Sequence, residues 1–310
     1  MRFLLHRLRR TGGTFALLGT LINSNTTLHL DGTLGLWQLN GAIIQGGSIT
    51  GSNTMVVVAN STLDGVTLNV PTSVQPAYDG GNCYSMALTV SNGLTLNSVL
   101  TLQRNDIYRS SAILSFAGTQ TLAGNGQVVF SDPGYNWSCT GEYLQPSSGT
   151  LTIGPDITIH GQRGYVGNPS LPLINRGTIL SDAGQTITVQ ANALTNLGTI
   201  LGSGGSLLLS GLADPRAVSV AGGNLTLNGA WTNSGPHDTR DNTDRSEDIF
   251  AKTFRSAGDV EVPQCGPPEA IGSLVPGKGS FRLQLRFSIR AHGGCYFIFP
   301  SGCHRRVSVD

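Results

Sequence analysis

A short apolar segment introduced by glycine recurs along residues 13–235 of this 310-residue chain, and this repetition restricts the fold more than any other feature. The clearest two copies, Leu173–Leu180 and Leu194–Leu201, share Leu, Asn, Gly, Thr, Ile and Leu in the same order. Their spacing is the signature of a solenoid with coils of about 21 residues. Nine glycines introduce the copies at unequal steps: Gly19, Gly47, Gly65, Gly93, Gly118, Gly149, Gly177, Gly198 and Gly223.

Within the copies, apolar residues alternate with Thr, Ser or Asn, as in Leu94–Asn97 and Ile187–Val189. This is the period of a strand with one buried face. A unit of two or three such strands cannot bury its own apolar face, so each unit must stack on the next. The Gly- and Asn-rich connections suit sharp corners and show no helical period. We therefore predict an all-β, single-stranded parallel β-helix (β-solenoid) of about 9 to 10 coils over residues 13–235. A β-sandwich is the competing fold, disfavoured because its strands are not normally copies of one another.

Five segments carry a family resemblance: Trp37–Gly41, Ile44–Ile49, Asn60–Asn69, Gly118–Gly126 and Leu194–Ile200. They resemble the β-strand repeats of large bacterial secreted proteins of the haemagglutinin and autotransporter-passenger type. The resemblance implies a right-handed parallel β-helix, export, and a surface or adhesive role. It carries no functional residues to transfer, because packing sets these repeats.

Charged side chains are scarce in the repeat region. Of the 37 charged residues, 4 lie in the segment 1–10 and 19 in the segment 236–310, which leaves 14 for the long stretch between them. Soluble domains are usually near a quarter charged, so the outer surface must be Thr, Ser, Asn, Gln and Gly. A net charge of +1 supplies no field to attract nucleic acid, and we exclude that partner. No apolar run approaches the roughly 18 residues of a transmembrane helix.

The two ends of the chain differ from the repeat region. Residues 1–12 are basic and lack a convincing signal peptide, and they suit a cap over the open end of the solenoid. Residues 236–310 hold both lysines, Lys252 and Lys278, and no copy of the repeat. Three interpretations stay open for this tail: a small domain, a disordered extension, or an out-of-frame translation of further coils. We favour the third, because the change in composition is abrupt.

Two insertions, residues 71–86 and 131–148, hold most of the side chains suited to binding. Exposed aromatic rings stack on sugars, so five of them are candidate carbohydrate contacts. We favour the alternative that they cover the apolar edge of the coils. The five are Tyr78, Tyr84, Tyr135, Trp137 and Tyr143. Cys83 and Cys139 can pair only if both insertions leave one side of the rod, and two coils separate them by about 10 Å, which favours unpaired thiols.

Catalysis is the alternative that this fold class raises, because pectin-type glycosidases and polysaccharide lyases share the β-helix. Their chemistry needs carboxylates within roughly 5 to 10 Å of each other. The carboxylates of the repeat region are spaced singly, and the nearest approach to a catalytic group is His160 with Asp156, Arg163 and, one coil away, Asp182. We expect no enzyme activity, no cofactor and no metal. The tail offers Cys and His residues without the spacing of a zinc site: Cys265, His292, Cys295, Cys303 and His304.

The function predicted from the sequence is a structural or adhesive fragment of a large exported bacterial surface protein, secreted or at the cell surface. Surface glycans or other cell-surface proteins are the expected partners. The alternative is a β-helix lyase or glycosidase that acts on acidic polysaccharide. Open strand edges at the last coil, around Leu225–Trp231, predict end-to-end self-association.

Overall fold

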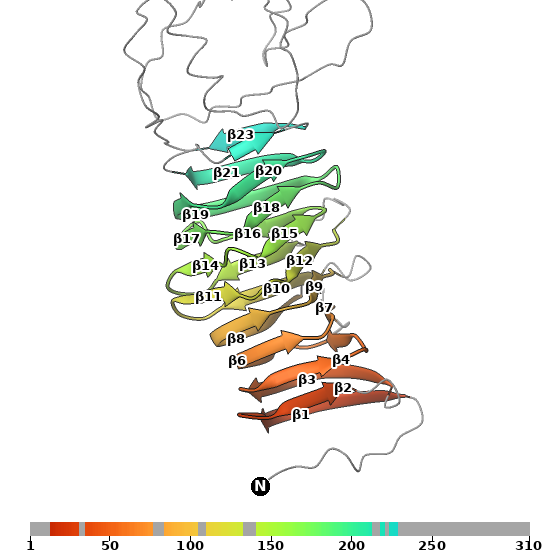
Figure 1. The fold of residues 1–310 in the computed structure, drawn as a ribbon. Helices are drawn as coiled ribbons and strands as arrows, with labels where there is room; N and C mark the ends of the chain where they lie inside the picture. Colours follow the sequence, from red (N-terminus) through yellow and green to blue (C-terminus); the bar gives the residue numbers. More distant parts are fainter. Residues whose placement is uncertain are drawn as a thin grey trace, which may run out of the picture.

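The structure, a computed structural model, describes residues 13–30, 35–76, 84–104, 110–132, 141–212, 218–220 and 223–228. These residues form an elongated all-β rod of 23 strands (Figure 1). The described part of the chain holds no helix of the length and hydropathy that a membrane span requires. The predicted N-terminal segment, 1–12, and the tail from 236 to 310 lie outside the described residues.

The chain winds around three faces, which it visits in a fixed order in every coil. The first face is built from the first halves of β1 (Thr14–Ile22) and β3 (Leu36–Gln45), followed by β5 (Met55–Val57), β7 (Thr72–Val74), β9 (Val99–Leu102), β12 (Gln127–Phe130), β15 (Thr158–Gly161), β18 (Thr178–Ser181), β20 (Thr199–Gly202) and β22 (Val218–Val220). Each strand pairs in parallel with the strand one coil before and after it. This face therefore contains one strand from each of ten successive coils.

The second and third faces follow the same scheme. The second face contains the second halves of β1 and β3, the first halves of β6 (Ser61–Asn69) and β8 (Ser85–Leu96), then β10 (Ser111–Phe116), β13 (Glu142–Pro146), β16 (Gly164–Val166), the first half of β19 (Thr186–Asn196), β21 (Ser206–Leu212) and β23 (Leu225–Asn228). The third face contains β2 (Thr27–Leu30), β4 (Ser48–Gly51), the second halves of β6 and β8, then β11 (Gln120–Ala123), β14 (Leu151–Ile153), β17 (Pro172–Asn175) and the second half of β19. The predicted parallel β-helix and its number of coils are confirmed.

The clearest repeat in the sequence is a true coil repeat. Leu173 pairs with Leu194 and Ile179 with Ile200, so the two copies lie one above the other in adjacent coils. Coil length varies elsewhere along the first face, where the step from Met55 to its partner Thr72 is short and the step from Gln127 to Thr158 is long. The coil length of the clearest repeat therefore holds only locally.

The nine glycines that introduce the sequence copies do not form one column of the solenoid. The series therefore does not show which residues of neighbouring coils are paired. Gly19 pairs with Ala42 inside β1, whereas Gly149 precedes the third-face strand β14 and Gly177 precedes the first-face strand β18. The physical reason is that every corner of a coil favours a residue free to adopt positive φ, and each coil has several corners. Gly19 and Gly149 indeed have φ of 74° and 67°.

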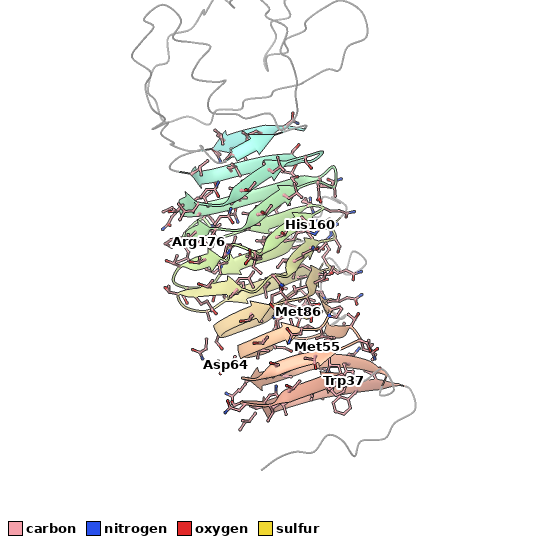
Figure 2. All side chains as sticks on the ribbon, viewed as in Figure 1. Trp37, Met55, Asp64, Met86, His160 and Arg176 are labelled. Carbon is pink, nitrogen blue, oxygen red and sulfur yellow. The ribbon has the colours of Figure 1, made fainter. Side chains whose placement is uncertain are left out.

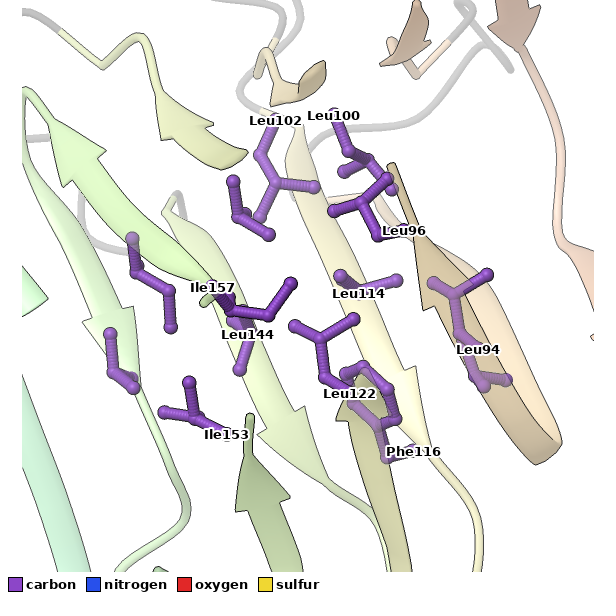
Figure 3. Close-up of a cluster of buried hydrophobic side chains, with 14 of the residues drawn as sticks. Leu94, Leu96, Leu100, Leu102, Leu114, Phe116, Leu122, Leu144, Ile153 and Ile157 are labelled. Carbon is purple, nitrogen blue, oxygen red and sulfur yellow. The ribbon is translucent and has the colours of Figure 1, made fainter. Parts of the chain in front are cut away.

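The core is a continuous column of aliphatic side chains inside the three faces. Strand β14 shows the pattern: Leu151 and Ile153 are fully buried, and Thr152 between them faces outward. Figure 3 shows side chains from several strands, Leu114 and Phe116 among them, that meet in the interior. Each fully buried aliphatic side chain contributes about 1.5–3 kcal/mol relative to exposure, and stacking is what removes it from water.

Polar side chains follow the outside of the rod along its length (Figure 2). Some form ladders between equivalent positions of neighbouring coils. On the outside, Asn97 donates from Nδ2 to Oδ1 of Asn69 at 2.8 Å. The buried Asn175 donates in the same way to Asn196 of the next coil at 2.8 Å. These bonds join amides that stacking brings together, and they reinforce the register set by the core.

Candidate functional site at the loop-bearing corner

Three successive coils carry their insertions at the same corner of the rod, where the first face turns into the second. The insertions leave after β7, β9 and β12 and return at β8, β10 and β13 (Figure 1). Residues 77–83, 105–109 and 133–140 within them lie outside the described residues. Of the predicted carbohydrate contacts, this excludes Tyr78, Tyr135 and Trp137 from description; Cys83 and Cys139 lie outside it as well.

The two described candidates, Tyr84 and Tyr143, flank this corner. Tyr84 is half-buried and packs against the hydrophobic core, as the coil-edge interpretation predicts for it. Tyr143, on β13, stacks on Tyr165 of β16 in the next coil, with ring centroids 4.8 Å apart and planes 16° from parallel. Burial raises the pKa of the Tyr143 hydroxyl, with a smaller contribution from Tyr165. One face of the Tyr143 ring is therefore covered by protein.

Beside this aromatic pair lies a buried ionic ladder formed by Arg104, Asp132 and Arg163. Asp132 is fully buried, and its two carboxylate oxygens lie 3.0 Å from Nε of Arg104 and 2.8 Å from Nε of Arg163. The backbone N–H of Arg163 also donates to the carbonyl of Asp132 at 3.0 Å, in an antiparallel bridge. The carboxylate thus ties together three successive coils, because β9, β12 and β15 pair in turn.

A second buried carboxylate, Glu142, adjoins this ladder at the start of β13. Its Oε1 accepts the backbone N–H of Arg104 at 3.0 Å and the hydroxyl of Ser131 at 3.2 Å, and its Oε2 accepts the backbone N–H of Ser131 at 2.6 Å. Burial raises the pKa of Glu142 from 4.5 to about 7, because desolvation outweighs these hydrogen bonds; the nearby Asp132 charge adds to the rise. Glu142 therefore titrates close to neutral pH.

The sequence analysis missed this cluster because it treated the carboxylates as isolated. The signal is present once the register is known. Leu102, Phe130 and Gly161 occupy one column, so the residues two positions later, Arg104, Asp132 and Arg163, occupy another. A positive, a negative and a positive side chain follow one another in that column, one from each coil. Alignment by strand register would have placed the three together.

The other group singled out in the sequence is an exposed ladder on the first face. His160, labelled in Figure 2, lies with Nδ1 3.1 Å from Oδ2 of Asp182 and Nε2 3.2 Å from Oε1 of Gln127. Asp182 also accepts the backbone N–H of Gly161 at 3.1 Å. Asp156 is exposed in a turn, and register places Asp182 opposite Gln162, so the suggested closeness of Asp156 and Asp182 is wrong.

Among the described residues, no group of three or more His, Cys, Asp or Glu side chains is arranged to hold a metal ion. The cysteines and histidines of the tail, from Cys265 to His304, lie outside the described residues. Comparison with known proteins adds no relative: no family model, no curated protein and no solved structure matches this chain.

Proposed function

We propose that this chain is a structural or adhesive rod of an exported bacterial surface protein. One observation carries the proposal: the parallel stack runs without interruption from β1 to β23 around a single core. Its span is on the order of 45 Å at the spacing of β-strands. A continuous stack of this kind resists bending, because every coil is hydrogen-bonded to the next along its strands.

The outer surface supports the same role. Its ladders of Thr, Ser and Asn carry few charges, which leaves hydrogen bonding and aromatic contact as the means of adhesion. The loop-bearing corner is the part of this surface that offers aromatic contact, since the stacked pair Tyr143 and Tyr165 lies there, where three insertions leave and return. Glycans or cell-surface proteins are the partners that we propose, and the cell surface or the medium is the proposed location.

A binding assay tests the adhesive role. The full chain, coupled to beads, is offered to a panel of neutral and acidic glycans and to intact cells. We expect binding that Tyr143→Ala weakens and that Leu197→Ala leaves unchanged, because Leu197 is an exposed apolar side chain remote from the corner. Equal loss in both variants, or binding that neither variant changes, would contradict the assignment to this corner.

Cleavage of acidic polysaccharide remains the second candidate, and one observation favours it: Asp132 and Glu142 adjoin each other, with arginines beside them. Both carboxylates are fully buried, however, whereas cleavage requires contact with the sugar. The test is release of reducing ends or unsaturated products from uronic-acid polymers, with and without calcium. Turnover that Glu142→Gln abolishes and Asp156→Ala does not would replace the adhesive proposal with the enzymatic one.

A further inference from the structure

The first coil is incompletely covered along β1. Three side chains of β1 point toward the interior and contact the core, yet they are only half-buried: Phe15, Leu17 and Leu21. Their register partners one coil later are 1 %, 0 % and 0 % exposed: Trp37, Leu39 and Ile44. Within the described residues, the second set has a coil on both sides, whereas the first set has a coil on one side only. The interior face of β1 is therefore shaped to receive another layer.

The backbone of β1 also has an open side. The carbonyl of Gly13 accepts from Leu36 at 3.0 Å and the N–H of Asn23 donates to Gln45 at 2.8 Å, so these odd-numbered residues face β3. Backbone groups alternate in direction along each half of β1, on either side of the irregularity between Leu17 and Gly19, which directs those of Ala16 and Thr20 away from β3. Within the described part of the chain, β1 pairs with β3 alone.

This edge lacks the devices that protect natural edge strands. Residues 13–30 contain no Pro, Lys, Arg, Asp or Glu. Two large apolar side chains of β1 are instead 69 % and 75 % exposed: Leu18 and Ile22. An edge with this composition is expected to be covered by another strand.

The opposite end of the rod is different, although the sequence predicted self-association there. The interior side chains of its last described strands, Val218, Leu225 and Leu227, are 2 %, 2 % and 7 % exposed. Trp231, the end of the predicted self-associating segment, lies outside the described residues. Among the described residues, β1 is therefore the end with exposed apolar surface, and two copies that meet through this same surface form a closed pair.

We propose that β1 is the interface of a head-to-head dimer, in which it pairs antiparallel with β1 of a second copy about a two-fold axis at Leu18. This register sets Leu18 opposite the partner's Leu18 and Ala16 opposite the partner's Thr20. The backbone groups of Ala16 and Thr20 point to the open side of β1, so they face each other across the interface. Phe15 then lies over the partner's Leu21, and the two half-exposed interior faces cover each other.

The second copy suits this edge better than residues 1–12 of the same chain. Those residues carry five basic side chains, and residues 13–30 offer no carboxylate to pair with them: Arg2, His6, Arg7, Arg9 and Arg10. The nine-residue strand β1 is, by contrast, matched in length by its own copy and has its centre at Leu18. A two-fold interface requires this self-complementarity.

Sedimentation equilibrium of the full chain tests the dimer. We expect a mass twice the 32.4 kDa of the chain. Leu18→Lys places two ammonium groups opposite each other at the axis, and this repulsion should weaken association at least about tenfold. Leu197→Lys is the matched control, since Leu197 is 60 % exposed and lies several coils from β1, and it should leave the dimer intact. Equal thermal transitions of the two variants establish that Leu18→Lys still folds.

A crosslink tests the register. With the five native cysteines replaced by serine, Leu18→Cys should form a disulfide with the same residue of the partner, because directly paired Cα atoms lie about 5.5 Å apart. Leu197→Cys should not. Three results would overturn the proposal: a monomer at all concentrations, a series of larger polymers, or a dimer that forms only after residues 1–12 are deleted. The last would show that those residues are the natural cover of β1.

Discussion

Replacement of Glu142 tests whether a buried acid destabilises the rod as pH rises. Its pKa in the folded chain is about 7, against 4.5 for the ordinary group, because burial disfavours the charged form. Between these values the folded state holds a proton that the unfolded state has released. Stability contributed by this group is therefore fully present below about pH 4.5, falls as pH rises toward 7 and is lost above it.

The magnitude follows from the difference between the two pKa values. One unit corresponds to about 1.4 kcal/mol, so the whole shift amounts to about 3.5 kcal/mol. About 2.5 kcal/mol of this fall in the free energy of unfolding should occur between about pH 5 and pH 8, because the unfolded state has already released much of its proton at pH 5. Glu142→Gln removes the titration and should flatten that part of the profile. The variant adds a constant cost, because one oxygen of Glu142 accepts the N–H of Ser131 and an amide NH₂ there would oppose it.

Urea unfolding at several pH values, for the parent chain, Glu142→Gln and the control Asp156→Asn, measures this effect. Asp156 lies in an exposed turn outside the buried cluster, so its variant controls for the loss of one carboxylate. The informative quantity is the difference in unfolding free energy between parent and variant as a function of pH. A Glu142→Gln profile as steep as that of the parent would refute the reasoning.

Three further predictions concern the stack, the ionic ladder and the tail. Gly184 and Gly211 both have φ of +76°, but a Cβ at Gly211 would lie 1.9 Å from the carbonyl oxygen of Ala191, whereas a Cβ at Gly184 has nothing within 4 Å. In thermal unfolding, Gly184→Ala should therefore cost about 1–2 kcal/mol of stability, and Gly211→Ala clearly more. Equal costs would contradict the close approach of neighbouring coils at Gly211. Asp132→Ala leaves two arginines without their shared carboxylate and should cost about 3–5 kcal/mol. Asp182→Ala removes a partly exposed contact with His160 and should cost no more than about 1 kcal/mol. Deletion of residues 236–310 should leave the melting temperature unchanged, because those residues lack the strand period needed to extend the stack; a fall of more than a few degrees would show that the tail covers the last coil.

The fold was predictable because two local signals agree. The alternation in segments such as Leu151–Ile153 marks one buried face, and near-identical copies such as those at Leu173 and Leu194 require stacking. Register was less accessible, since glycine marks every corner and insertions change coil length. Alternation of apolar and polar residues shows which side of a strand is buried, but it does not show to which face of the solenoid the strand belongs.

The candidate site was harder to predict for the same reason. Arg104, Asp132 and Arg163 come together only because the strands that precede them are stacked in register, although the coils between them differ in length. The shift in the pKa of Glu142 depends on desolvation, which sequence spacing does not report. Tyr84, in contrast, packs against the hydrophobic core, a contact that its large ring beside a strand already suggests in the sequence.

Cysteine pairs across the coils test the central claim, the parallel in-register stack, most directly. Thr152, Ile174 and Thr195 face outward in one column of the third face, one coil apart in turn. In a chain freed of native cysteines, the pair at 174 and 195 spans one coil, about 4.8 Å, and should oxidise to a disulfide. The pair at 152 and 195 spans two coils, about 10 Å, and should stay reduced under the same conditions. Efficient crosslinking of the second pair without the first would contradict the β-solenoid.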